Sequence, residues 1–254
     1  MASDNSMRDR APGHSVMEQV VKLQDAATPR SAVARALGLS PLTEEASPWF
    51  AGATGEREVG ALLERLPQGW TVYHAVPVGT GDADIDHVAV GPGGVFAINT
   101  KNHRGRKVWV GDRAVLVDGA KQPYIRNSEL EASRVRHVLA TAGIAAPVHA
   151  VVAIVAPASF TVRQQPARVT LLEADALVRW MGRRPVAVDQ AATAAIVALF
   201  DQPETWRVGA ADASTVERFD ALAREVRVAR LVRQGWVLAG ALAIVATVLA
   251  LLPR

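Results

Sequence analysis

The stretch "DIDHVAVGPGGVFAINTKN", residues 84–102, decides the fold. It holds two segments of strand length, residues 84–90 and 94–101, which the short Pro/Gly loop "GPGG" connects. Such a loop is typical of a hairpin, so the two segments are predicted to be antiparallel neighbours in one sheet. Charged side chains stand at the start of the first segment and at the end of the second. They cost stability there unless they reach water or have a chemical role.

Strand periodicity brings three of these polar side chains together. Alternate residues of a strand share a face, so Asn99 and Lys101 point to one side of the second strand. Asp86 precedes the apolar half of the first strand, and His87 points to the opposite face. If the hairpin sets the two faces together, Asp86, Asn99 and Lys101 converge at one end of the sheet. A carboxylate and an amide oxygen can hold Mg²⁺, and a lysine beside them can position water or offset negative charge.

The surrounding sequence predicts a mixed α/β domain over about residues 49–205. Hydrophobic periodicity and turn residues give helices and strands in this order: a helix at 55–66, a strand at 70–78, the central hairpin, a second hairpin at 107–119, a helix at 126–142, strands at 148–157 and 168–173, and helices at 174–182 and 189–200. Residues 1–48 are predicted to be an N-terminal extension. It is disordered over 1–14, forms a helix over 15–39 that Pro29 interrupts, and ends in a linker at 39–49.

The C-terminal part of the chain predicts a membrane anchor. Residues 206–234 read as a charged amphipathic linker helix, and residues 235–252 as a transmembrane helix. The segment "WVLAGALAIVATVLALL", residues 236–252, has no charge and would form a helix roughly 25 Å long. The arginines at 224, 227, 230 and 233 precede it, which favours a single-pass cell-membrane protein whose catalytic domain is cytoplasmic. The alternative is a buried helix of a soluble core, but such a helix usually has a polar stripe.

Composition sets wider limits. The 254-residue chain has no cysteine, which excludes disulfides and thiol catalysis. Its net charge of +3 is compatible with nucleic acid or an anionic membrane surface and proves neither.

The central hairpin resembles a known nuclease superfamily. An aspartate on one strand, followed by an acid-x-Lys motif at the end of the next, is the signature of the PD-(D/E)xK nucleases. The surrounding residues are similar to their nuclease-related domain, known as NERD. The matching pieces are "GEREV" (55–59), "DIDHVAVGPGGVFAINTKNHRG" (84–105) and "QPYIRNSELEASRV" (122–135), and together they cover roughly residues 50–160. The resemblance implies a restriction-endonuclease-like mixed sheet flanked by helices.

The resemblance also implies roles for particular residues. Asp86 would bind the metal, Lys101 would be the catalytic lysine, and Glu56 would be an acidic residue facing the site from the first helix. Asn99 occupies the place of the acid in acid-x-Lys. This departure removes a negative charge, so metal affinity and catalysis should fall, although the amide oxygen can still be a ligand. The implied metal ligands are Asp86, Asn99 and Glu56, and the implied cofactor is Mg²⁺, with Mn²⁺ as an alternative.

Each of these residues also has an ordinary structural interpretation. Lys101 could be a solvated strand end, and Glu56 could be a favourable charge at a helix N-terminus. Asp84 could be a turn residue, and His87 a hydrogen-bonded structural histidine. Glu131 is spaced three residues from Arg134, which is typical of a surface pair on a helix.

Basic residues that follow the site are candidates for contact with a phosphate backbone. They are Arg104, Arg106, Lys107, Lys121 and Arg126. The sequence therefore predicts a membrane-tethered, Mg²⁺-dependent nuclease, with DNA favoured over RNA as its nucleic acid. The main alternative is a catalytically weakened nuclease fold that binds nucleic acid or a protein at the inner membrane face. A third is a purely structural protein whose arginines at 224–233 bind anionic lipid.

Overall fold

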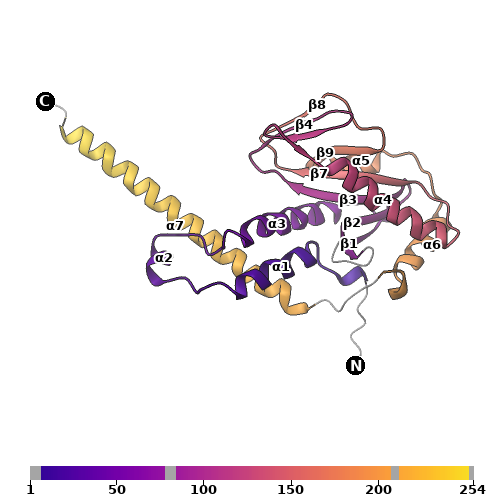
Figure 1. The fold of residues 1–254 in the computed structure, drawn as a ribbon, viewed down its shortest axis with the longest axis horizontal. Helices are drawn as coiled ribbons and strands as arrows, with labels where there is room; N and C mark the ends of the chain where they lie inside the picture. The colour runs from indigo at the N-terminus through magenta and orange to yellow at the C-terminus, as the bar shows by residue number, and fades with distance from the viewer. Residues whose placement is uncertain (1–6, 78–83, 207–211, 252–254) are drawn as a thin grey trace. The chain divides into compact units, whose positions relative to one another are not determined.

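The computed structural model describes residues 7–77, 84–206 and 212–251 (Figure 1). Contacts divide the chain into two compact units. The first comprises Met1–Val16 and Ala51–Asp212, and the second comprises Met17–Phe50 and Ala213–Arg254.

A five-stranded mixed sheet is the centre of the first unit. Its strands run in the order β1-β2-β3-β7-β9. Their bounds are Thr71–Pro77 for β1, Asp84–Gly91 for β2, Gly94–Asn102 for β3, Val148–Val155 for β7 and Val169–Glu173 for β9. The predicted hairpin is confirmed, since β2 and β3 pair antiparallel from His87↔Ile98 to Gly91↔Gly94. On its other side β3 pairs parallel with β7, so the strand that carries the Asn-Thr-Lys motif is central.

Helices cover both faces of this sheet, as the mixed α/β prediction required. Their bounds are Ala46–Leu63 for α3, Tyr124–Thr141 for α4, Leu177–Gly182 for α5 and Gln190–Phe200 for α6. Val135 of α4 and Ile196 of α6 pack in one apolar cluster with Val152 of β7. Val59 of α3 and Leu177 of α5 belong to a second cluster. Strand β7 contributes to both clusters, which explains its continuous apolar sequence.

A smaller four-stranded sheet follows the order β6-β5-β4-β8. Its strands are β4 (Lys107–Val110), β5 (Val115–Val117), β6 (Ala120–Gln122) and β8 (Ser159–Val162). The predicted second hairpin is confirmed by the antiparallel pairing of β4 with β5. Strand β8 was not predicted, because three of its four side chains are exposed and it lacks a buried apolar face. Two short turns of 3-10 helix, η2 (Ala174–Ala176) and η3 (Pro203–Thr205), complete the C-terminal part of this unit.

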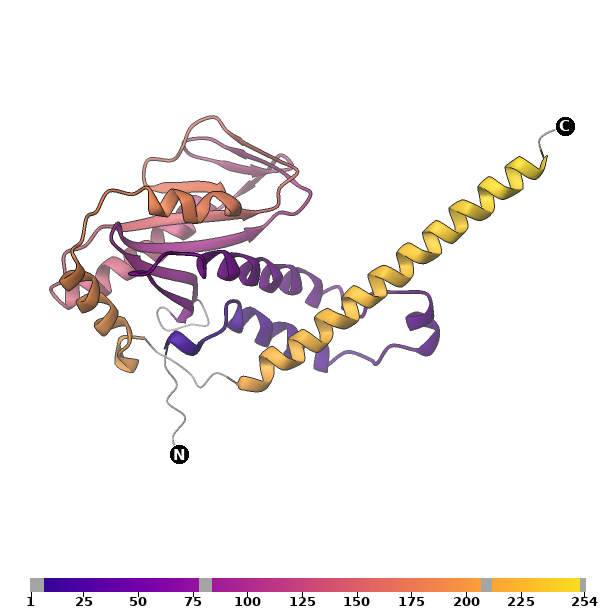
Figure 2. The same ribbon diagram turned by 180° about the vertical axis from the view of Figure 1, so that it is seen from behind.

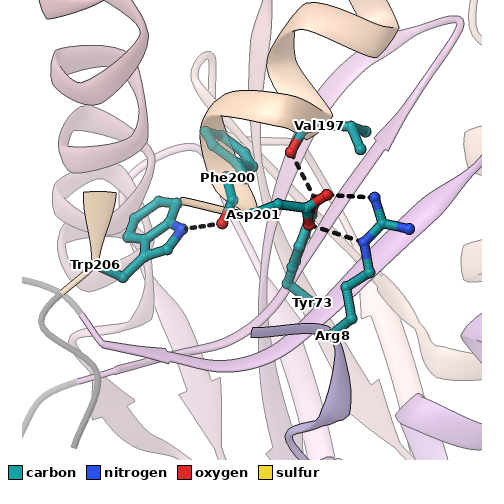
Figure 3. Close-up of polar contacts among 6 residues, drawn as sticks. All are labelled: Arg8, Tyr73, Val197, Phe200, Asp201 and Trp206. Atoms are coloured by element: carbon teal, nitrogen blue, oxygen red, sulfur yellow. Dashed lines mark hydrogen bonds and ion pairs between the residues drawn. The ribbon is translucent and has the colours of Figure 1, made fainter. Parts of the chain in front are cut away.

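The N-terminal prediction of disorder is wrong for residues 7–14. They form η1 (Met7–Asp9) and lead into α1 (His14–Asp25), and the side chain of Met7 is buried. Arg8 binds both carboxylate oxygens of Asp201, at 2.8 and 2.5 Å, and the Tyr73 hydroxyl donates to the same carboxylate at 2.9 Å (Figure 3). This contact ties the start of the chain to the end of α6. Polar residues without periodicity gave no sequence signal for it.

Trp206 packs against the same end of α6. The indole N–H of Trp206 donates to the carbonyl oxygen of Phe200 at 3.0 Å, and the Trp206 ring meets the Phe200 ring edge-on with centroids 5.0 Å apart (Figure 3).

The second unit is built on one long helix, α7 (Ala213–Leu251), drawn in yellow and orange in Figure 2. From Ala213 onward the predicted linker helix and the predicted span are therefore a single uninterrupted helix. Trp206 and Asp212 are not helical, and residues 207–211 of the predicted linker and 252 of the predicted span lie outside the described residues. The helix expected over residues 15–39 is broken as predicted, into α1 and the short α2 (Ala32–Ala36). Helix α3 begins at Ala46, nine residues before its predicted start at 55, so the predicted linker ends earlier. Pro48 lies in its first turn, where a missing N–H costs nothing.

Candidate active site

Asp86 is held beside the end of β3. The β2–β3 register pairs His87 with Ile98, so its continuation by one pair sets Asp86 opposite Asn99. The backbone N–H of Thr100 donates to Oδ2 of Asp86 at 2.5 Å, and the Asp86 side chain is buried. A buried carboxylate is thereby fixed at the point where the apolar part of both strands ends.

Glu56 approaches from α3. It lies on the same helical stripe as Val59 and Leu63, and only 5% of it is exposed. Gly13, at a φ of +78°, packs directly against this turn of α3, since a Cβ there would lie 3.4 Å from the Cβ of Glu56. Within the described residues, Oε2 of Glu56 is buried and has no hydrogen-bond partner.

Glu131 is the residue that sequence reasoning missed. Its Oε1 accepts a hydrogen bond of 2.6 Å from Nδ2 of Asn99, so it reaches the site from α4. A surface pair with Arg134 was the wrong interpretation of its position. The signal was available: Glu131 is three residues after Ser128 and four before Val135, and both are buried against the sheet. A carboxylate on that stripe must face the end of β3.

Lys101 stands at the end of β3 and is half-buried. Its Nζ lies 5.7 Å from the ring centroid of Tyr124, at the start of α4. The Tyr124 hydroxyl in turn lies 2.8 Å from Nε2 of His103. The aromatic rings of Tyr124 and His103 stack, with centroids 5.6 Å apart, and so border the ammonium group on one side.

The acidic groups at this end of the sheet perturb one another. Burial raises the pKa of Glu56 far above its ordinary range, and the charges of Asp86 and Asp84 raise it further. Burial also raises the pKa of Asp86, while Lys101 lowers it. Burial, followed by the charge of Asp86, raises the pKa of Glu131 to about 7. Buried carboxyls with mutually raised pKa values are typical of functional sites.

Asp84 is more than a turn residue. Burial raises its pKa, while a hydrogen bond from Ser15 and the charges of Arg10 and His14 lower it. The N-terminal segment that sequence analysis expected to be disordered therefore lines this side of the acidic group.

His87 has the structural role that its opposite face predicts. It is completely buried, and its Nδ1 lies 2.8 Å from Nδ1 of His74 on β1. Burial lowers the pKa of both imidazoles.

The predicted nucleic-acid contacts fall into two groups. Arg104 binds Glu58 at 2.6 Å and Arg106 binds Asp118 at 2.8 Å, so their charges are partly compensated. The three others, Lys107 on β4, Lys121 on β6 and Arg126 on α4, have exposed side chains. All five lie between the end of β3 and the first turn of α4 in the sequence, and contact with nucleic acid stays a prediction.

The residues at the site fit a hydrated divalent cation in part. In the described part of the chain, buried oxygens without a hydrogen bond include Oδ1 of Asn99, Oε2 of Glu56 and Oε2 of Glu131. Such oxygens are the hard donors that Mg²⁺ prefers, and this ion keeps several waters of its own. No three His, Asp or Glu side chains among the described residues are arranged as a ready-made metal site. Asn99 and water would have to complete the coordination.

The family comparison agrees with this geometry. Residues 51–155 match the family model of the nuclease-related domain. This segment is a NERD domain. Its general kind is the PD-(D/E)xK nuclease-like superfamily, and the matched range contains every site residue named above on β2, β3, α3 and α4.

Curated relatives of the NERD domain add little about its chemistry. An uncharacterized protein of Bacillus anthracis is 34% identical over 77 residues, which are 29% of this chain and 36% of that protein. The chain thus spans about a third of the length of this curated relative. No solved structure matches the chain.

Proposed function

We propose that the chain is a membrane-tethered, Mg²⁺-dependent nuclease that hydrolyses nucleic-acid phosphodiester bonds, DNA rather than RNA. The observation that carries the proposal is a set of buried acids at the end of the central strand. Asp86 accepts from the Thr100 N–H, Glu131 accepts from the Asn99 amide, and Glu56 is buried on α3. Each of these carboxyls has a raised pKa, and the Lys101 charge lowers all three. Such an acidic group is costly to bury without a function.

The side chains would divide the work as follows. Asp86, Asn99 and Glu56 would hold Mg²⁺, with Mn²⁺ as a substitute, and the ion would supply Lewis acidity toward the phosphate. Lys101 would position a water molecule and offset negative charge that develops on the phosphate. Glu131, with a pKa near 7, is suited to take the proton of that water. The exposed Lys107, Lys121 and Arg126 would bind the phosphate backbone.

The tether would be α7. It is the one helix in the described residues that is long and apolar enough to cross a membrane, and its apolar window is not buried. The arginines before the span favour a cytoplasmic NERD domain on the cell membrane.

Asn99 favours a second candidate function. It brings no charge to the metal, and its amide is already bound to Glu131. In this alternative, the domain binds nucleic acid or a protein at the inner membrane face without cleaving it.

Cleavage by the full chain in lipid nanodiscs separates the two candidates. Labelled single- and double-stranded DNA and RNA are incubated with Mg²⁺, Mn²⁺ or EDTA. The nuclease predicts metal-dependent cleavage that Asp86→Asn and Lys101→Met reduce about 100-fold or more. The control Lys22→Met alters an exposed lysine on α1 that has no proposed role, and should change cleavage little. Binding that weakens with salt, without cleavage, would instead establish the binding module.

A further inference from the structure

The second unit has an apolar surface beside the start of the candidate span. Val33, Leu37 and Leu39, on and just after α2, are 67%, 48% and 51% exposed. Three large, exposed apolar side chains in one short segment are unusual on a surface in contact with water. We call residues 31–40 the α2 segment.

Two contacts fix the α2 segment against α7 at a defined height. The indole N–H of Trp236 donates to the carbonyl oxygen of Ala36 at 2.8 Å. Gly38, at a φ of +68°, lies so close to α7 that a Cβ there would be 2.5 Å from the backbone nitrogen of Arg233. The α2 segment is therefore level with residues 229–236, directly before the uncharged stretch begins.

Charge and exposure on α7 agree with a bilayer at that height. Beyond the contact, the side chains of Val237, Leu242 and Ile244 are 67%, 70% and 67% exposed. Around and before it, the exposed basic side chains of α7 include Arg227, Arg230 and Arg233, and Arg35 is exposed on α2. No acidic residue occurs between Val226 and the end of the chain, so nothing there offsets this positive charge. Tryptophan at the end of a span and arginines beside it are the residues that lie at a membrane interface.

We propose that the α2 segment is a second membrane contact. Val33, Leu37 and Leu39 enter the headgroup region of the bilayer that α7 spans, and the neighbouring arginines bind the phosphates of anionic phospholipids. The partner is identified by continuity: the apolar surface of the α2 segment adjoins the apolar surface of the span, so one bilayer covers both. This inference rests on the proposed tether but not on nuclease activity.

The absence of cysteine makes the test clean, because each introduced thiol is unique in the chain. Leu37→Cys, Val245→Cys and Val186→Cys are labelled with a fluorophore in the full chain. Each protein is reconstituted in phosphatidylcholine nanodiscs that contain phosphatidylglycerol. Nitroxide lipids then quench from the headgroup or from deep in the acyl chain. Val186 is the matched control, since it is an exposed apolar residue of the first unit.

The expected result is strongest headgroup quenching at position 37, about twofold above deep quenching, and the reverse order at 245. Position 186 should not be quenched. Deep quenching at 245 without quenching at 37 would overturn the inference and leave the tether intact. Absence of quenching at 245 would overturn both, whatever the cleavage assay shows. Equal quenching at 37 in pure phosphatidylcholine would overturn the role of anionic lipid.

A glycine pair supplies an independent check. Gly38→Val forces the α2 segment away from α7 and should abolish quenching at 37 while quenching at 245 persists. Gly143→Val is the matched control, because Gly143 has a similar φ of +70° and no neighbour within 4 Å of a new Cβ. Unchanged quenching in Gly38→Val would show that the packing on α7 does not place the segment in the membrane.

Discussion

The amide of Asn99 on β3 donates a 2.6 Å hydrogen bond to the carboxylate of Glu131 on α4. The residue that replaces the motif acid is thus coupled to an acid from a different element. The negative charge missing at position 99 is present a few ångströms away, on a helix. The site therefore retains acidic character although the acid-x-Lys motif is incomplete.

Restoring the motif acid should lower the stability of the metal-free protein and raise its affinity for metal. Asn99→Asp replaces the hydrogen-bond donor to Glu131 with a second carboxylate, so like charges meet in a buried place. In EDTA we expect the variant to lose about 1–3 kcal/mol of unfolding free energy. Mg²⁺ should then raise its melting temperature more than it raises that of the wild type. Asn127→Asp, at an exposed position of α4, should do neither. A variant as stable in EDTA as the wild type would contradict the Asn99–Glu131 contact.

Glu131 should make metal-free stability depend on pH. Its pKa is raised from its ordinary value of 4.5 to about 7 in the folded chain. Between these two pH values the folded state holds a proton that the unfolded state has released. Stability from this group is complete below the ordinary pKa and is lost as pH rises through 7. We expect the melting temperature in EDTA to fall between about pH 5 and 7, and Glu131→Gln to flatten that fall. Glu129→Gln, two residues away on a different face of α4, is the control. Identical pH profiles for Glu131→Gln and wild type would refute this role.

Much of this site could be predicted from sequence, and the parts that could not have physical reasons. The β2–β3 hairpin follows from the loop at 91–94, and the Asp86, Asn99 and Lys101 positions follow from strand periodicity. Glu131 was missed because Arg134, three residues on, offered a simpler surface partner. The spacing of Glu131 from Ser128 and Val135 was the signal that favoured burial, and the packing of that stripe of α4 decided between the two interpretations.

The N-terminal segment was missed for a different reason. Residues 7–14 have no periodicity, since η1 is a single turn and its anchors lie far away along the chain. Arg8 binds Asp201, and Asp84 is near Arg10. Long-range pairing of isolated polar residues leaves no pattern in sequence. The early start of α3 was hidden by Pro48, which reads as a helix breaker although it lies in the first turn.

Lys101 should hold down the pKa values of its three acidic neighbours. Lys101→Met removes a charge that lowers the pKa of Glu56, Asp86 and Glu131. More carboxyls then stay protonated when folded, so the melting temperature in EDTA should fall more steeply between pH 6.5 and 8. Lys107→Met changes an exposed lysine and should leave the slope unchanged. A slope equal to that of the wild type would place Lys101 outside the electrostatic reach of the acids.

The Arg8–Asp201 contact should secure the N-terminal segment. Arg8→Gln removes a bidentate ion pair that is partly exposed, so the loss of unfolding free energy should be modest, about 1 kcal/mol. Hydrogen exchange around Met7 should become faster while exchange in β3 stays slow. The control Arg113→Gln breaks a highly exposed pair with Asp112 and should change neither. Unaltered exchange near Met7 would show that burial of Met7 alone holds this segment.

Helix α7 runs without a break from Ala213 to Leu251, so rotation and length are coupled along the whole helix. Each inserted residue would turn one end about 100° against the other and lengthen the helix by about 1.5 Å. The α2 segment contacts α7 at two positions, Gly38 at Arg233 and Ala36 at Trp236. One residue added between Arg233 and Trp236 would rotate one contact site relative to the other, so the two contacts could not form together. The spacing from Arg233 to Trp236 therefore fixes the position along α7 at which the α2 segment can pack.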